Sequence, residues 1–141
     1  MVYVDTSVLV ALLAHEEHCN AVARWYAGAK AELISATWCV TEFASALGIK
    51  QRTGQMVNEQ ALAALERFGR LVANDLQLLP VDPADFHRAA LLTFDPASSV
   101  RAGDAQHLAC AFHAGAKSIA TLDDVLAHSA PRVKIKPLSF A

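Results

Sequence analysis

Short β-prone runs alternate with longer helical patterns from one end of this chain to the other, and this alternation restricts the fold more than any other feature. Two neighbouring parallel strands cannot be joined by a tight turn, so a helix usually connects them. The alternation therefore predicts an α/β fold. We expect a central, mostly parallel, twisted sheet of four to five strands, covered by helices on both faces to give three α/β/α layers.

The expected strands are short runs of apolar and β-branched residues at positions 1–4, 32–36, 76–81, 118–122 and 133–136. The expected helices have apolar residues at helical spacing, at positions 6–14, 20–29, 37–51, 55–72, 83–92, 104–114 and 123–128. Pro83 follows the N-cap residue Asp82, and Gly115 ends a helix. The sequence has no linker rich in glycine, serine or proline and no internal repeat, so we expect a single domain over residues 1–141.

With 54% hydrophobic and 18% charged residues and no low-complexity tract, the chain is expected to fold. The apolar stretch from Val8 to Ala14 is too short to cross a bilayer, and it follows Asp5 instead of a basic segment. We therefore expect neither a membrane helix nor a signal peptide. The three cysteines are widely spaced, which favours neither a disulfide framework nor a CxxC zinc site. These features fit a cytoplasmic protein.

The formal net charge is −2, whereas domains that bind nucleic acid by neutralising phosphates are usually basic. Any contact with nucleic acid must therefore come from a local basic patch or from metal ions.

Four acidic residues are expected at one edge of the sheet, where the carboxyl ends of parallel strands gather ligands. They are Asp5 after the first strand, Glu42 one turn into the helix after the second, Asp104 at the start of a helix, and Asp123 at the end of the fourth strand. An aspartate between a strand and a helix often serves only as a helix N-cap, and that interpretation stays open for the three aspartates.

Glu42 differs from the aspartates because its helical neighbours form a mostly apolar stripe, made by Trp38, Ser45, Ala46 and Ile49. A lone carboxylate on such a stripe is costly unless something pairs with it. The open alternative is a surface glutamate whose charged end reaches solvent at the edge of the stripe.

If the four carboxylates converge, they need a cation. Two ionised carboxylates about 5 Å apart repel by roughly 3 kcal/mol at an effective dielectric constant of about 20. Oxygen ligands select a hard ion, so Mg²⁺ or Mn²⁺ is the expected occupant. One or two such ions activate a water and stabilise the leaving oxygen of a phosphodiester, which predicts hydrolysis without a protein nucleophile.

Four segments carry a resemblance to a known family. They are the opening Met-Val-Tyr-Val-Asp-Thr-Ser-Val-Leu-Val-Ala-Leu-Leu, the Thr-Glu-Phe at 41–43 within an Ala-rich helix, the Arg-Ala-Gly-Asp-Ala-Gln-His-Leu-Ala at 101–109, and the Ala-Thr-Leu-Asp at 120–123. In order and spacing they resemble the motifs of the PIN domain, particularly those of the VapC toxins. The similarity extends over essentially the whole chain.

This resemblance implies a PIN-like fold and a Mg²⁺- or Mn²⁺-dependent endoribonuclease that is the toxin of a toxin–antitoxin pair. It implies that the catalytic metal site consists of Asp5 and Asp104 as the firmest ligands, with Glu42 and Asp123 contributing directly or through water. The implied partners are an RNA substrate and a cognate antitoxin, with no membrane. The apolar composition would also suit a homodimer.

Thr6 and Thr121 match positions where the family often carries a hydroxyl that orients a carboxylate or a water. Five basic residues are candidates for contact with RNA phosphates: Lys50, Arg52, Arg67, Arg70 and Arg101. Charges at helix ends are usually only solvated, but Arg101 is the most interesting because it precedes Asp104 by three residues. Three aromatic residues could stack on bases, although aromatics in helical patterns are more often core: Trp25, Tyr26 and Trp38.

His107 lies one turn after Asp104 and could touch substrate, although we favour a histidine in the core or behind the site. His15, His18 and Cys19 lie close enough in sequence to suggest a transition-metal site. The loop between two expected helices is also a natural place for such polar residues, and we favour that interpretation.

Three alternative functions stay open. A catalytically silent PIN-like module would only bind RNA or protein, and the intact set of four acids argues against it. An aspartyl-phosphate phosphatase would use Asp5 as the nucleophile, but it needs an aspartate where Ser7 stands. A receiver-like domain would use Asp82 as phosphoacceptor with Thr121 nearby, but it lacks the paired acids expected after the first strand.

Overall fold

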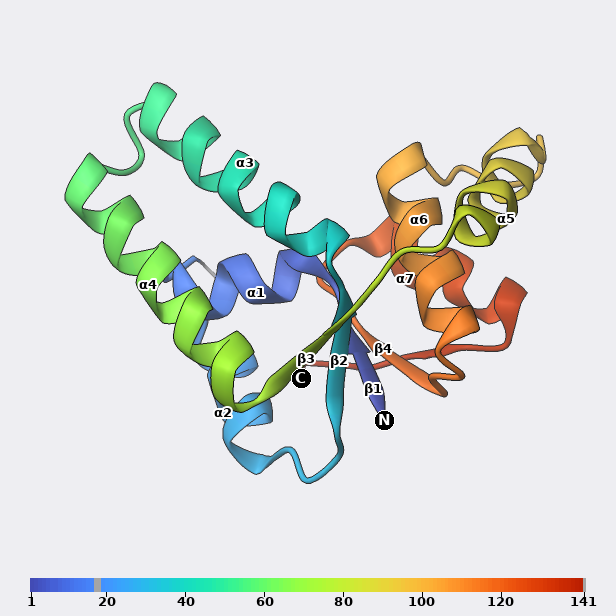
Figure 1. The fold of residues 1–141 in the computed structure, drawn as a ribbon, viewed down its shortest axis with the longest axis horizontal. Coiled ribbons are helices and arrows are strands. Elements are labelled where there is room, and N and C mark those ends of the chain that lie inside the picture. Colours follow the sequence, from blue (N-terminus) through green and yellow to red (C-terminus); the bar gives the residue numbers. More distant parts are fainter. Residues whose placement is uncertain (17–18, 141) are drawn as a thin grey trace.

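A computed structural model describes residues 1–16 and 19–140 and confirms the predicted three-layer α/β/α architecture (Figure 1). The strands are β1 (Val2–Val4), β2 (Leu33–Ala36), β3 (Leu76–Leu79), β4 (Ser118–Ala120) and β5 (Lys136–Pro137). The helices are α1 (Thr6–Leu13), α2 (Cys19–Gly28), α3 (Trp38–Arg52), α4 (Asn58–Asn74), α5 (Pro83–Phe94), α6 (Ala102–His113), α7 (Asp124–Ser129) and the 3₁₀ helix η1 (Ala130–Val133).

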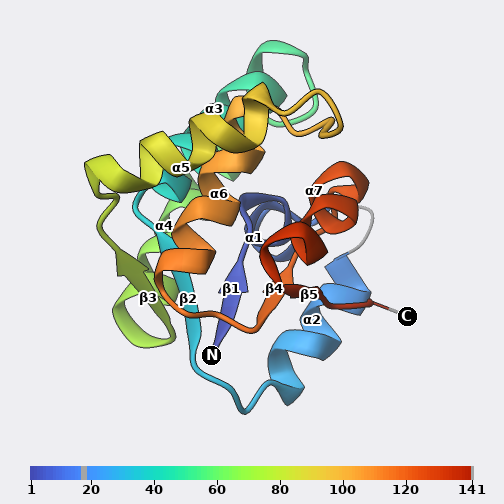
Figure 2. The same ribbon diagram turned by 90° about the vertical axis from the view of Figure 1, so that its right-hand side faces the viewer.

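All neighbouring strands of the sheet are parallel, in the order β3-β2-β1-β4-β5, which Figure 2 shows side by side. The chain builds the sheet outward from β1 through β2 to β3, and then returns to the other side of β1 with β4 and β5. The strand order therefore reverses between β1 and β4. In open parallel sheets, ligands bind outside the carboxyl ends of the strands at such a reversal.

Two hydrophobic cores fix the layers. Helices α1 to α4 cover one face of the sheet and α5 to α7 cover the other (Figure 1). Successive side chains of a strand point to opposite faces, so Val4 packs in the first core and Tyr3 in the second. In α3, Phe43 and Leu47 are buried in the first core, and Phe43 stacks on Phe68 of α4 with ring centroids 4.7 Å apart. This buried side leaves another side of α3 facing the carboxyl edge of the sheet.

β4 ends at Ala120, two residues earlier than the expected strand, because the next two residues bond to the β1–α1 segment. The Thr121 hydroxyl donates a hydrogen bond to Asp5, and the Leu122 backbone N–H donates to the Ser7 hydroxyl, at 2.8 and 2.9 Å. These two hydrogen bonds link the carboxyl end of β4 to that of β1, and these are the two strands that flank the strand-order reversal.

The strand expected at 133–136 is present but begins later, because η1 occupies residues 130–133 and β5 spans Lys136–Pro137. Pro131 lies at the start of η1, and Lys134 then adopts a left-handed conformation with φ of 61°. Helix α4 also begins later than expected, at Asn58, because Gly54 with φ of 76° turns the chain after α3. The described residues include no helix both long and apolar enough to cross a membrane.

Candidate functional site

Asp5 lies at the carboxyl end of β1, where it is buried and is the N-cap residue of α1. Its Oδ2 atom accepts hydrogen bonds from the hydroxyls of Ser7 (2.6 Å) and Thr121 (2.8 Å), and a longer one from the Ser7 backbone N–H (3.4 Å). Its Oδ1 atom lies 3.5 Å from His107 Nε2. The capping interpretation thus accounts for only one of the two carboxylate oxygens.

Glu42 is half-buried on α3, and its two oxygens also have different surroundings. Oε1 accepts a hydrogen bond of 2.7 Å from the Thr6 hydroxyl and contacts His107 Nε2. Oε2 faces Gly103 of α6, where an added Cβ would lie 3.2 Å away. Burial alone would raise the pKa of Glu42, but the hydrogen bond and charge of His107 and the Thr6 hydroxyl outweigh burial and lower it. Glu42 is therefore a paired, ionised member of the site and not a surface glutamate reaching solvent.

Asp104 lies in the first turn of α6, whose N-cap residue is Arg101, so the capping interpretation is wrong for Asp104. Its carboxylate makes no hydrogen bond with the part of the chain that the structure describes. Burial and the negative charges of Asp123 and Asp5 raise the pKa of Asp104 to about 6, although the charge of His107 opposes this. Burial is the largest cause of this raised pKa, and the nearby negative charges of Asp123 and Asp5 add to it.

Asp123 is the N-cap residue of α7, as the capping interpretation allowed. Its Oδ1 atom accepts hydrogen bonds from the backbone N–H groups of Val125 (2.9 Å) and Leu126 (3.0 Å). The other carboxylate oxygen accepts none from the described residues. The Asp123 carboxylate therefore combines a capping role with a position close enough to raise the pKa of Asp104.

The charges of Asp123, Asp5 and Glu42 all act on Asp104, so the four predicted acids lie near one another, and three of their carboxylates share one pattern. In each of Asp5, Glu42 and Asp123, one oxygen is held by hydroxyls, backbone N–H groups or His107, and the other is left for a ligand. Ligand atoms of Asp5, Glu42 and His107 all lie within 4.8 Å of one another. The carboxylates near this group repel one another, and a divalent cation bound among them would relieve the repulsion.

His107 was expected either in the core or behind the acid site, and it lies in the core directly behind the acids. It is almost fully buried, its Nδ1 atom lies 2.7 Å from the Tyr3 hydroxyl, and its Nε2 atom contacts Glu42. Burial alone would lower the pKa of His107, but the hydrogen bond to Glu42 and the charge of Asp5 raise it. The imidazole therefore fixes the positions of two carboxylates from the buried side.

Sequence reasoning did not single out Tyr3 or assign a role at the metal site to Ser7, although both support it. The Ser7 hydroxyl donates to Asp5 and accepts from the Leu122 N–H, so it links the β1 and β4 ends. The sequence feature that could have identified Ser7 is its hydroxyl, which lies two residues after an aspartate at the end of a strand. Tyr3 carried no comparable signal, because its partner His107 is 104 residues away in sequence.

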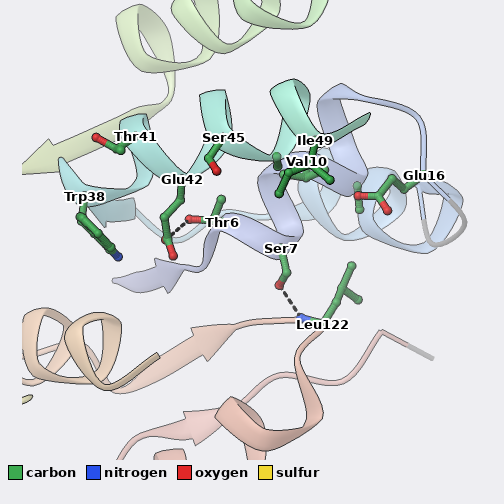
Figure 3. Close-up of a pocket in the computed structure, with 12 residues that line it drawn as sticks. Thr6, Ser7, Val10, Glu16, Trp38, Thr41, Glu42, Ser45, Ile49 and Leu122 are labelled. Carbon is green, nitrogen blue, oxygen red and sulfur yellow. Dashed lines mark hydrogen bonds between the residues drawn. The ribbon is translucent and has the colours of Figure 1, made fainter. Parts of the chain in front are cut away.

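A cleft of about 600 Å³ opens beside the acids between α1 and α3 (Figure 3). Its lining residues come from both helices and from the segment after β4: Thr6, Ser7, Val10, Ala11, Glu16, Trp38, Thr41, Glu42, Ser45, Ala46, Ile49 and Leu122. The apolar stripe predicted around Glu42 therefore faces an open cleft and not the core, and Trp38 is exposed.

Of the other aromatic candidates, Trp25 and Tyr26 pack against the first core. Three of the five basic candidates are engaged elsewhere: Arg67 with the backbone carbonyl of Leu13, Arg70 with Glu66, and Lys50 with Glu16. Arg101 is exposed at the start of α6 and forms no ion pair with the described residues.

Asp82 belongs to a different cluster at the end of β3, together with Asp85 and His113. The Asp85 carboxylate accepts a hydrogen bond from the Asp82 backbone N–H (2.9 Å) and lies 2.8 Å from His113 Nδ1. Thr121 bonds instead to Asp5. The receiver-like interpretation, which needs Asp82 beside Thr121, is therefore not supported. Among the transition-metal candidates, His15 and Cys19 join no potential metal-ligand group of the described residues, and His18 lies outside them.

A family model described as the PIN domain matches residues 2–130 of the chain. No curated protein has a sequence that matches the chain. Sixteen chains of solved structures are similar to it.

Three of these structures illustrate the likeness. VapC20 of Mycobacterium tuberculosis, a sarcin–ricin loop cleaving toxin, is 18% identical with a TM-score of 0.73 and covers 97% of this chain and 100% of its own. FitAcB of Neisseria gonorrhoeae is 16% identical with a TM-score of 0.74 and coverages of 99% and 98%. VapBC2 of Rickettsia felis, bound to a DNA fragment from its promoter, is 13% identical with a TM-score of 0.65 and coverages of 98% and 98%. At these identities the likeness shows a shared fold.

Proposed function

The chain belongs to the PIN domain family, and from this premise we propose that it is a metal-dependent endoribonuclease and the toxin of a toxin–antitoxin pair. The observation that carries the proposal is the grouping of acids at the strand-order reversal: Asp5 and Glu42 have ligand atoms within 4.8 Å of each other, and the charges of Asp123, Asp5 and Glu42 all act on Asp104. Structural likeness to a sarcin–ricin loop cleaving toxin and the sequence resemblance to VapC toxins support the toxin role.

The donor chemistry of the site fits Mg²⁺ or Mn²⁺. Asp5 Oδ1, Glu42 Oε2, the second oxygen of Asp123 and the Asp104 carboxylate are oxygen ligands left unused by the hydrogen bonds described above. Hard divalent cations prefer such ligands. When bound, the ion would supply an activated water and charge stabilisation for the leaving oxygen of the phosphodiester.

The chain's own side chains would act by holding the carboxylates in place. The hydroxyls of Ser7 and Thr121 fix Asp5, while Thr6 and His107 fix Glu42, so neither carboxylate rotates when its other oxygen binds a ligand. Arg101 lies at the exposed start of α6, three residues before Asp104, where its guanidinium would contact an RNA phosphate.

Cleavage of RNA by the purified protein tests the nuclease proposal. We expect cleavage in Mg²⁺ or Mn²⁺, none in EDTA, none with Asp5→Asn or Asp104→Asn, and severe impairment with Glu42→Gln or Asp123→Asn. Asp82→Ala, in the separate cluster, is the control and should remain active. A parent protein that binds RNA but does not cleave it in either metal would favour the silent binding module instead.

Expression in cells tests the toxin proposal. The protein alone should arrest growth, and co-expression of a cognate antitoxin should restore growth and yield a stable complex. Unhindered growth with abundant active protein would remove the toxin role and leave the nuclease in place.

We also propose a homodimer, because Phe86, Leu91 and Phe94 of α5 are 55%, 75% and 87% exposed. The molar mass in solution tests this proposal.

A further inference from the structure

We propose that the cleft between α1 and α3 binds one unstacked nucleobase of the RNA next to the scissile phosphate, with Trp38 as the stacking surface. The inference rests on the proposed ribonuclease function and narrows its substrate to RNA that is unpaired at this position. None of the comparisons assigns a role to this cleft.

The cleft is continuous with the acid site. Thr6, Ser7 and Glu42 line it and also belong to the hydrogen-bond network of the carboxylates (Figure 3). A strand whose phosphate lies at the acids must place its neighbouring nucleotide within a few ångströms of them. The cleft, at about 600 Å³, has the size of pockets that hold small organic groups, roughly 300–1,000 Å³.

The lining of the cleft favours an uncharged ring over a phosphate. Its twelve residues, all within the described chain, include two carboxylates and no lysine or arginine. Val10, Ala46 and Ile49 supply apolar surface, and the Ser45 hydroxyl supplies a hydrogen-bonding group for the edge of a base. Binding through base stacking also removes the difficulty that the net charge of −2 poses for phosphate neutralisation.

Trp38 occupies the end of the cleft nearest the acids. It is the first residue of α3 and is 36% exposed, and its Nε1 atom lies 4.0 Å from the position of a Cβ at Gly103. Figure 3 shows Trp38 and Glu42 side by side at the same end of the cleft. The indole therefore stands between the cleft and the start of the helix that carries Asp104, where a base flanking the phosphate would stack.

Tryptophan fluorescence tests this inference without relying on cleavage. Trp25 packs against the core and Phe140, so Trp25→Phe retains an aromatic ring there and leaves Trp38 as the only indole. We combine it with Asp104→Asn so that the RNA stays intact, and titrate a short single-stranded oligoribonucleotide. Saturable quenching of Trp38 is expected. Quenching should be weaker with a strand that carries an abasic residue at the bound position and with a fully paired duplex.

Three substitutions test the role of the Trp38 side chain in RNA binding. Each is made in the Asp104→Asn background with Trp25 retained, and RNA affinity is measured by fluorescence anisotropy of a labelled strand. Trp38→Ala should weaken binding about tenfold, within the range for loss of one stacked base. Trp38→Phe should keep most of the affinity. Val40→Ala removes a 44% exposed apolar side chain of the same helix outside the cleft and should change nothing. In the cleaving parent, Trp38→Ala should raise KM more than it lowers kcat.

The outcomes separate this inference from the proposed function. Equal RNA affinity of Trp38→Ala and its parent, with the cleaving protein still active, would overturn the base site and leave the nuclease. Base-dependent quenching, with no cleavage by the parent protein, would support the base site and overturn the nuclease. Unchanged RNA binding together with loss of the antitoxin complex in Trp38→Ala would make the cleft a protein-docking site and overturn the inference.

Discussion

The Nε2 atom of His107 contacts the Oε1 atom of Glu42 on the buried side of the acid cluster. The same ring is held from behind by the Tyr3 hydroxyl, 2.7 Å from Nδ1. A contact path therefore runs from β1 through α6 to α3 and, together with the Thr6 hydroxyl, sets the position of the Glu42 carboxylate.

Removal of this support should weaken the site without removing any of its four acids. We expect His107→Ala to lower metal affinity or cleavage rate by roughly 10- to 100-fold, the usual effect of losing a group that orients a ligand. Tyr3→Phe should have a smaller effect of the same sign. Isothermal titration with Mn²⁺ and cleavage kinetics measure both, and His113→Ala, on the same helix in the other cluster, is the control. Equal losses in the His107 and His113 variants would point to general damage to α6.

Metal affinity should depend on pH through Asp104, whose pKa is raised to about 6 by burial and by Asp123 and Asp5. A protonated carboxyl is a poor ligand, so the Mg²⁺ affinity should rise with pH up to about 6 and then level off. Titrations of the parent across this range measure the effect. In Asp104→Asn the affinity should be low and should lack this step, so an unchanged step in the variant would assign the titration to another group.

The predicted layers are confirmed, and both the layers and the choice of the four acids rest on local signals. Asp5 and Asp123 follow apolar strands, and residues that follow parallel strands gather at one edge whatever the details of packing. Glu42 was predicted for a different reason, since a carboxylate on an apolar helical stripe needs a partner.

The contact of His107 with Glu42 could not be predicted, because the two residues are 65 positions apart in sequence. The orienting role of the Thr121 hydroxyl, 116 residues from Asp5, was expected only through the family resemblance. Trp38 looked like a core aromatic because helical spacing shows which residues share a face but not what that face meets. Packing of Phe43 and Leu47 in the core decides that Trp38 faces the cleft.

Gly103→Ala should separate stability from function. Alanine has the higher helix propensity, by up to about 1 kcal/mol, and Gly103 lies inside α6 without a positive φ. The new Cβ would lie 3.2 Å from Glu42 Oε2, so the carboxylate would have to move at the oxygen left for the metal. We expect thermal denaturation to show equal or higher stability, with reduced metal affinity. A variant with full metal affinity would argue that Oε2 is not a ligand.

Two substitutions should separate the helix-capping role of Asp123 from its role in metal binding. Asn is as good an N-cap as Asp, so Asp123→Asn removes the charge while keeping an oxygen for the N–H groups of Val125 and Leu126. Asp123→Ala also removes the cap and should be less stable than Asp123→Asn by about 1 kcal/mol. Denaturation in EDTA compares the two variants. Both should bind metal less tightly than the parent, and a normal affinity in either would leave Asp123 only its capping role.

Asp104→Asn should stabilise the metal-free protein, because Asp104 is not a cap and its charge meets three other carboxylates. Its pKa in the folded state, about 6, lies above the ordinary value of 3.8. The stability tied to its protonated form is therefore complete below the ordinary value and is lost as the pH rises through about 6. In EDTA near neutral pH, Asp104→Asn should thus melt above the parent, and the difference should vanish as the pH falls below 3.8. Metal at about 100 times its dissociation constant should stabilise the parent by about 2.7 kcal/mol and the variant much less, so the advantage of the variant should shrink when metal is added. A variant that is less stable than the parent by the same amount with and without metal would mean that the four acids do not form a metal site.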